Sequence, residues 1–182
     1  MIKDFLDARK KIIEGRGKVL TANLILENIY SGKTGASATR FYRLKVGGEF
    51  FFVKEIEKGM QGRKFIPGGE NPHRQIKALE EAKKVIESNP GLGDYEVSVP
   101  HLAFSGSNRL FFVSEYQPSF TVEELRKSPE LRKKNPGVVE QFDRDFKQLN
   151  GLMGKAGVGD FDGINVLYSP LRKKFIIIDV RW

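Results

Sequence analysis

Residues 39–56 read TRFYRLKVGGEFFFVKEI, and this stretch decides the fold class. Aromatic and β-branched residues on both sides of the Gly47-Gly48 pair predict two antiparallel strands joined by a tight turn. The preceding LTANLILENIY, at 20–30, has the same strand-forming composition, and the Gly- and Ser-rich SGKTGASA at 31–38 follows it. The pattern therefore predicts a three-strand antiparallel meander with a glycine-rich loop after its first strand.

A helix and two more strands are expected after the meander. The helix is predicted over 73–88, because Asn89-Pro90-Gly91 ends a segment of helical period. Its apolar residues share one face: Ile76, Leu79, Ala82, Val85 and Ile86. The two strands are EVSVPHLAFSG at 96–106 and RLFFVSEY at 109–116. A short amphipathic helix is also predicted at the N-terminus, over residues 2–14.

The chain becomes helical after Pro118. TVEELRKS at 121–128 predicts a short N-capped helix. A longer helix ending at Gly157 is predicted from an apolar stripe made by Val139, Phe142, Phe146, Leu149 and Met153. Two strands, NVLYS at 165–169 and KFIIIDV at 174–180, form a terminal hairpin. This order predicts an α+β, two-lobed fold: a five-stranded antiparallel sheet with one inserted helix, then a minimal helical lobe.

Composition restricts the partners. The chain has 31 Lys and Arg against 23 Asp and Glu, and the net charge of +8 favours anionic partners. Much of the excess lies in short clusters at 9–11, 132–134 and 172–174, which are interpreted as solvated surface. Without cysteine and with two histidines, a metal ion would be held by oxygen ligands. The sequence lacks a long apolar run and a signal-like N-terminus, so no membrane span and a cytoplasmic location are expected.

Two aspartates and one asparagine near the C-terminus predict phosphoryl-transfer chemistry. In GDFDGIN, Asp160 can orient the proton of an acceptor hydroxyl, and Asn165 can coordinate Mg2+ through its amide oxygen. Asp179 ends the apolar run FIII and would lie beside Asn165 if the two terminal strands pair. A carboxylate and a neutral oxygen suit a hard divalent cation that keeps phosphate oxygens as its other ligands.

A cation and a glycine-rich loop complete this predicted site. Lys54, on an apolar strand, would be paired by phosphate oxygens and by a helix glutamate, either Glu81 or its neighbour Glu80. In the 31–38 loop, Gly32, Gly35 and Ser37 would bring backbone N–H groups close to phosphates. The same loop is rejected as a P-loop, because the first glycine of that motif is replaced by Glu27 and a strand follows.

The order of these parts resembles the protein-kinase-like superfamily, and within it the aminoglycoside-phosphotransferase-like and small atypical kinases. GASATRFYRLKVGGEFFFVKEI resembles the nucleotide-loop and lysine-strand region, and Asp160 with Asn165 resembles the catalytic loop. IIIDV, around Asp179, resembles the metal-binding aspartate motif. The similarity covers residues 20–182. It implies a bilobal kinase-like fold with an extension over 1–18, an N-lobe over 19–117 and a C-lobe over 118–182.

The resemblance also implies roles for matching residues. Lys54 would hold the α- and β-phosphates of ATP, and Glu81 would orient Lys54. Asp160 would be the catalytic carboxylate, and Asn165 and Asp179 would bind Mg2+. The hinge that pairs with adenine through backbone groups would run from Glu115 to Gln117, with Ser114 at the gatekeeper position.

Some features depart from the family pattern. Val158 stands where the family usually has a histidine, and Val180-Arg181 replaces the frequent Phe-Gly. The similarity stops at Trp182, so the family's acceptor-binding helices have no counterpart, and a protein partner or second subunit would complete the C-lobe. The phosphate acceptor stays open among protein, sugar, lipid headgroup and small alcohol.

Three functions are therefore compared. The first is a Mg-ATP-dependent phosphotransferase. The second is a pseudokinase-like module that binds nucleotide or a partner without turnover. The third is a basic nucleic-acid-binding domain, which ranks last because the Lys and Arg residues are not interleaved with aromatic residues along the sequence.

Overall fold

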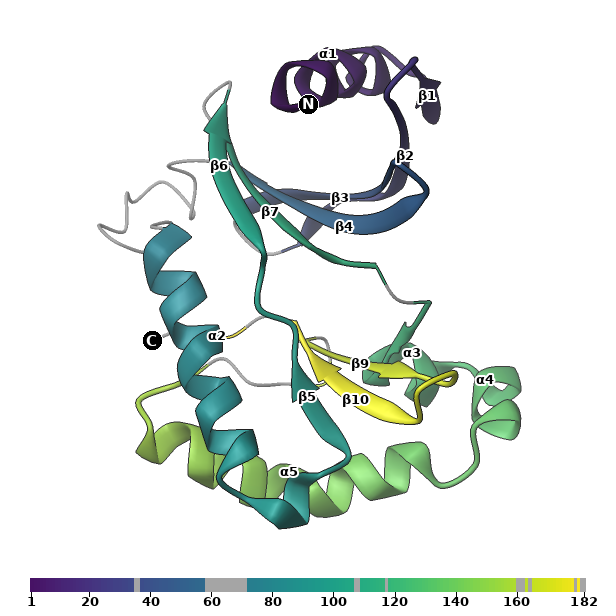
Figure 1. Ribbon diagram of the computed structural model, residues 1–182. Helices are drawn as coiled ribbons and strands as arrows, with labels where there is room; N and C mark the ends of the chain where they lie inside the picture. The colour runs from purple at the N-terminus through teal and green to yellow at the C-terminus, as the bar shows by residue number, and fades with distance from the viewer. Residues whose placement is uncertain are drawn as a thin grey trace. The chain divides into compact units, whose positions relative to one another are not determined.

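The fold was analysed in a computed structural model. It describes the backbone of residues 1–34, 37–57, 72–106, 109–116, 118–159, 163, 165–178 and 180, and the side chains of these residues outside 30–39, 56–57 and 72–75. The described residues form five α-helices and ten strands in a mixed α+β arrangement (Figure 1). The predicted α+β class is confirmed.

The chain forms two compact units. The first unit is Met1–Pro72 with Pro100–Tyr116, and the second is His73–Val99 with Gln117–Trp182. Each unit has its own cluster of buried apolar residues. The segment from His73 to Val99 thus belongs with the C-terminal residues, whereas the sequence-based segments grouped it with the N-terminal sheet.

The first unit is built on a six-stranded sheet with the order β1-β2-β3-β4-β7-β6, in which all neighbours are antiparallel. Its strands are β1 (Lys18–Leu20), β2 (Leu24–Thr34), β3 (Ser37–Val46), β4 (Glu49–Glu57), β6 (Leu102–Gly106) and β7 (Arg109–Glu115). The two hairpins β2-β3-β4 form the predicted meander.

The prediction of five strands was wrong, because the segment predicted as one strand over 20–30 reverses direction near its start. Thr21 donates its backbone N–H to the carbonyl oxygen of Leu24 at 2.9 Å, and its hydroxyl oxygen accepts from the N–H of Leu24 at 3.1 Å. This tight turn lets β1 pair with β2. A threonine hydroxyl can form such a turn without glycine, so the strand-forming composition concealed it.

The segment predicted as a strand over 96–106 also divides. Its first part is β5 (Tyr95–Val97) of the second unit, and its last part is β6. Pro100 separates them, and proline cannot donate to a strand ladder. On one side, Ser98 donates its N–H to Ile177; on the other, His101 donates its N–H to Val113, so the two parts join different sheets.

The glycine-rich segment is mostly strand. The β2-β3 pairing continues through Gly32 opposite Thr39 to Thr34 opposite Ser37. The predicted loop over 31–38 is therefore shorter than expected, with Gly32 and Ser37 inside the ladder. Gly35 lies outside the described residues.

Helix α1 (Ile2–Ile13), predicted from its spacing, is confirmed and covers one face of the six-stranded sheet (Figure 1). Phe5 is 3% exposed and packs edge-on against the rings of Tyr42, Phe104 and Phe111. Successive residues of a strand point to opposite faces of the sheet, so the neighbours of these core residues along each strand lie on the other face. We call that side the Lys54 face, because Lys54 of β4 belongs to it.

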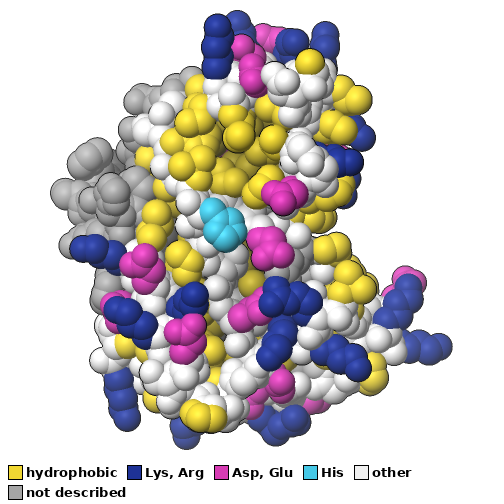
Figure 2. Space-filling view, viewed as in Figure 1, with side chains coloured by type: hydrophobic (Ala, Val, Ile, Leu, Met, Phe, Trp, Pro, Cys, Tyr) yellow, Lys and Arg dark blue, Asp and Glu magenta, His cyan; other side chains and the backbone are white. Residues whose placement is uncertain are grey.

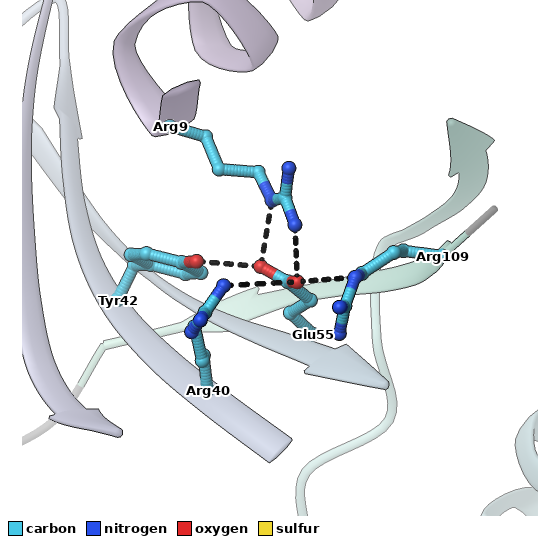
Figure 3. Close-up of polar contacts among 5 residues, drawn as sticks. All are labelled: Arg9, Arg40, Tyr42, Glu55 and Arg109. Carbon is cyan, nitrogen blue, oxygen red and sulfur yellow. Dashed lines mark hydrogen bonds and ion pairs between the residues drawn. The ribbon is translucent and has the colours of Figure 1, made fainter. Parts of the chain in front are cut away.

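A buried ion pair joins α1 to the sheet (Figure 3). Arg9 of α1 donates from Nε and Nη2 to the two carboxylate oxygens of Glu55, at 2.8 and 2.6 Å. The hydroxyl of Tyr42 donates to the same carboxylate at 2.5 Å, and the guanidinium groups of Arg109 and Arg40 lie at 3.1 and 3.9 Å. Glu55 is fully buried and Arg9 is 8% exposed. The interpretation of Arg9 as part of a solvated cluster was therefore wrong.

The surroundings of Glu55 set its ionisation. Burial alone would raise the pKa of Glu55, but the hydrogen bonds from Arg9 and Tyr42 and the positive charges of Arg9 and Arg109 together hold that pKa below its ordinary value. Burial, and then the hydrogen bond to Glu55, raise the pKa of Tyr42, so its hydroxyl remains a donor at neutral pH. The cluster is therefore a carboxylate held by cations and one phenol.

The second unit packs helices against a four-stranded sheet with the order β5-β10-β9-β8. β5 is parallel to β10, and the other pairs are antiparallel. The strands are β8 (Phe120–Thr121), β9 (Val166–Ser169) and β10 (Lys174–Ile177), besides β5. The helices are α2 (Pro72–Glu87), α3 (Val122–Lys127), α4 (Pro129–Lys134) and α5 (Val138–Lys155), with the short 3-10 helix η1 (Pro90–Leu92). The predicted terminal hairpin is thus the centre of a larger sheet.

The helices of this unit follow their sequence signals. α2 buries Leu79 and Ala82 of its predicted apolar face, and α5 buries Phe142, Leu149 and Met153. Thr121 caps α3 in a capping box with Glu124, as the TVEELRKS pattern predicted. Periodicity and capping therefore located α2, α3 and α5, whereas α4 and η1 were not predicted.

Removing the charge of Glu55 should destabilise the fold strongly. Glu55→Gln leaves three guanidinium groups around a neutral amide, and we expect a loss of about 3–5 kcal/mol in the free energy of unfolding. Arg9→Met should cost less, because Arg40 and Arg109 still face the carboxylate. Urea denaturation measures both values. Glu27→Gln, which breaks the partly exposed pair with Arg43, is the control and should cost about 0–1 kcal/mol. Equal losses of unfolding free energy for Glu27→Gln and Glu55→Gln would contradict the role of Glu55 as a buried, charge-paired carboxylate.

The contribution of Glu55 should also depend on pH. Because its pKa is lower in the folded chain, the stabilisation is complete above the unfolded value of 4.5 and is lost as the pH falls through the folded value. Urea denaturation of the wild type and of Glu55→Gln between about pH 7 and pH 3 should show a difference in unfolding free energy that narrows on acidification. A constant difference would show that Glu55 is not ionised in the folded chain.

Candidate functional site

The mouth of the β9-β10 hairpin carries the predicted metal-binding positions. Ile177 pairs with Val166 in the ladder, and beyond them Ile178 donates its N–H to the carbonyl oxygen of Asn165 at 3.0 Å. The expectation that the two strands pair is confirmed. Asn165 therefore lies at the open end of the hairpin, opposite Ile178. Asp179, the next residue, is outside the described part of the chain.

The strand leading to this mouth is held firmly. Phe175, Ile176 and Ile177 are at most 4% exposed, so β10 is buried on both faces between β5 and β9. The Phe175 ring stacks on Tyr95 with centroids 4.7 Å apart and lies 6.0 Å from the Phe142 ring of α5. A strand with this many apolar contacts gives the residue after it a fixed backbone position.

The segment before the hairpin begins in the core. Val158, in the position where the resemblance would have a histidine, is 1% exposed, and its N–H donates to Met153 of α5 at 2.8 Å. This valine is thus part of the hydrophobic core of the second unit. Asp160, the predicted catalytic carboxylate, lies outside the described residues, while Gly163 accepts a hydrogen bond from Glu123 of α3.

In the first unit, Lys54 occupies a central strand. Its register partners are Phe41 on β3 and Phe112 on β7, and Lys54 is half-buried between them. Phe41 stacks on Phe52, with ring centroids 5.3 Å apart. Lys54 therefore shares the sheet face opposite α1 with its register partners Phe41 and Phe112.

The predicted hinge begins at the end of β7. Glu115 is exposed and pairs with Phe51, and the N–H of Tyr116 donates to the carbonyl oxygen of Phe50 at 3.3 Å. Ser114, at the predicted gatekeeper position, is 9% exposed. Gln117 lies outside the described residues. Lys54 and Glu115 are thus brought onto neighbouring strands.

The predicted partner of Lys54 makes a different contact. Glu81 lies on α2 in the second unit and accepts a hydrogen bond from Lys84 of the same helix at 2.5 Å. This contact raises the pKa of Lys84. Glu80 is exposed. The carboxylate of Glu81 is therefore engaged in an ion pair within its own helix.

Sequence reasoning overlooked Glu55. A signal for it was present: Lys54 and Glu55 are adjacent on a strand, so they lie on opposite faces, and one of two charged residues must point toward the core. The sequence of that strand does not indicate which residue pairs with the core glutamate. It is supplied by Arg9, which is 46 residues earlier in the chain.

The basic clusters noted in the sequence are largely paired. Arg132 contacts Glu140 at 2.5 Å, Lys134 contacts Glu130 at 3.1 Å, and Arg172 contacts Glu96 at 2.6 Å. Figure 2 shows Lys and Arg side chains lying among acidic ones over one face of the molecule. The clusters at 132–134 and 172–174 are therefore ordinary surface, unlike Arg9 of the first cluster.

Comparison with known proteins adds no assignment: the chain matches no protein-family model, and a search of curated proteins finds no match. Among the described helices, none is long and apolar enough to cross a membrane. In the same part of the chain, no group of three or more His, Cys, Asp or Glu side chains could hold a metal ion. The predicted ligands Asn165 and Asp179 are a different donor set, one amide and one carboxylate oxygen, which suits Mg2+.

Proposed function

We propose that the chain is a Mg-ATP-dependent phosphotransferase that transfers the γ-phosphate to a hydroxyl acceptor. The observation that carries the proposal is the hairpin mouth, where Ile178 donates to Asn165 at the end of a strand buried on both faces. Asp179 follows Ile178 directly in the sequence. An amide oxygen and a carboxylate at such a place fit Mg2+.

The sheet of the first unit supports the proposal independently. Five of its six strands, β2, β3, β4, β6 and β7, correspond to the predicted ones, and α2 lies between β4 and β6 in the chain, as the predicted helix does. Lys54 lies on the central strand β4, among aromatic residues. A cation there would bind the phosphates of a nucleotide on the Lys54 face.

The roles of the residues follow from phosphoryl transfer. Asp160 would accept the proton of the acceptor hydroxyl as its oxygen attacks the γ-phosphorus, and the bond from that phosphorus to the β–γ bridging oxygen breaks, which releases ADP. Lys54 would neutralise charge on the phosphates that leave. Mg2+ held by Asn165 and Asp179 would supply further neutralisation.

Nucleotide binding is the first test. ATP with Mg2+, at about 100 times its Kd, would stabilise the folded chain by about 2.7 kcal/mol and raise its Tm by roughly 5–10 °C. Asp179→Ala should remove this rise, and Lys54→Met should reduce it, because the metal and the phosphates each lose a ligand. Differential scanning fluorimetry measures the shift. No shift in the wild type would overturn the proposal.

Two exposed residues provide controls for these variants. Asp7→Ala on α1 and Lys147→Met on α5 remove the same charges from the surface and should leave the shift unchanged. A reduced shift in the controls would indicate a general charge effect in place of a specific site.

Turnover is the second test. Release of ADP or autophosphorylation with Mg-ATP, abolished by Asp160→Asn, is expected of a phosphotransferase. A nucleotide-dependent Tm shift without turnover would instead favour a pseudokinase-like binding module. Coupled ADP detection on the wild type and Asp160→Asn distinguishes the two.

A further inference from the structure

The register of the six-stranded sheet interleaves cations with aromatic rings on the Lys54 face. Cross-strand partners share a face, so Lys18, Glu27, Arg43 and Phe52 form one row across β1 to β4. The next row is Leu20, Ile25, Lys45 and Phe50. These residues come from four strands, and the rows become evident only when the strand register is known.

The two rows enclose a hollow of about 260 Å³ within the first unit, and its lining is Lys18, Ile25, Glu27, Arg43, Lys45 and Phe50. This volume is close to the lower end of about 300–1,000 Å³ for small-molecule sites. It can therefore hold one planar ring with a short attachment.

The charge of this hollow is positive. Its lining has three cations and one carboxylate, and Glu27 is engaged by Arg43 in a hydrogen-bonded ion pair. Within the part of the chain that the structure describes, Lys18 and Lys45 make no ion pair. Two ammonium groups thus lie beside the hollow and favour an anionic ligand.

Phe50 gives the hollow an aromatic wall. It is 45% exposed and lies near the start of β4, opposite Lys45 of β3. The Lys45 ammonium lies 5.1 Å from its ring centroid, and the Arg43 guanidinium lies 6.0 Å from that centroid and 5.7 Å from the Tyr116 ring. An exposed ring beside cations, of which Lys45 makes no ion pair in the described part of the chain, is the combination on which bases stack while phosphates are neutralised.

We infer that this part of the Lys54 face binds single-stranded nucleic acid, with a base on Phe50 and the flanking phosphates near Lys18 and Lys45. An acidic peptide would account for the cations but would leave the exposed ring without a role. Phe50 and Lys54 are four residues apart on β4, about 13 Å along the strand, so the two sites are separate. The inference does not depend on the proposed phosphotransferase activity.

The experiment is fluorescence anisotropy of a labelled oligothymidylate of about ten nucleotides, titrated with the full chain without ATP. We expect binding that weakens as salt rises from about 50 to 200 mM. Phe50→Ala should weaken binding by about 5- to 150-fold, and Phe50→Trp should retain it. Lys45→Gln should weaken binding and lower the slope of log K against log salt by about 0.7.

Matched controls separate this site from general charge or instability. Leu102→Ala removes an exposed apolar side chain from the opposite face of the same sheet, and Lys133→Gln removes a surface charge on α4; both should bind as the wild type does. Asp179→Ala should also bind normally, because it tests only the proposed ATP site. Circular dichroism melting confirms that each variant is folded.

Several results would overturn the inference. They are the absence of binding at low salt, equal binding of duplex DNA of the same length, and unchanged affinity of Phe50→Ala. Competition by polyglutamate that depends on Lys45 but not on Phe50 would identify an acidic protein segment as the ligand and would equally refute a nucleic-acid site.

Discussion

The ion pair between Arg9 and Glu55 is the constraint around which the first unit is organised. A carboxylate buried in a sheet core is tolerated only where cations and hydrogen-bond donors surround it, and here they come from α1, β3 and β7. The N-terminal helix is thus part of the fold of this unit. Because three elements converge on one side chain, a shift in the register of any of them would remove part of the compensation for a buried charge.

Glu55 also determines which sheet face can meet a ligand. Glu55 and Lys54 are consecutive on β4, so fixing the glutamate beneath α1 turns the lysine to the opposite face. That face carries Lys54 among phenylalanine rings at one place and the hollow lined by Lys45 and Phe50 at another. The two proposals therefore use the same strand, which presents its functional residues on one side and its anchoring residue on the other.

In the second unit, the central strand is held by apolar packing, whereas in the first unit an ion pair holds α1 on the sheet. β10 lies between two strands and ends at the hairpin mouth, where Ile178 donates to Asn165. Burial of Phe175 and Ile177 holds the backbone that leads to Asp179. The packing of this strand thus fixes the described backbone of the hairpin up to Ile178.

Local signals in the sequence were sufficient for most of the fold. Helical spacing located α1, α2 and α5, the Thr121 capping box located α3, and alternating runs located the strands of the meander and the hairpin. The errors arose where a strand-like run contained a turn without glycine, at Thr21, or passed from one sheet to another, at Pro100. In both places the residues before and after the interruption are equally strand-like in composition. Only the hydrogen-bond partners therefore show where one strand ends and the next begins.

The candidate site shows the same division. The types and spacing of Lys54, Asn165 and Asp179 along the chain predict phosphate and metal chemistry, and that prediction rests on the sequence. The tertiary structure alone decided that Arg9 neutralises Glu55 and that Arg43 lies beside the Tyr116 ring. Contacts of this kind depend on strand register and helix placement, which bring together residues whose separation in the sequence holds no information about their distance in space.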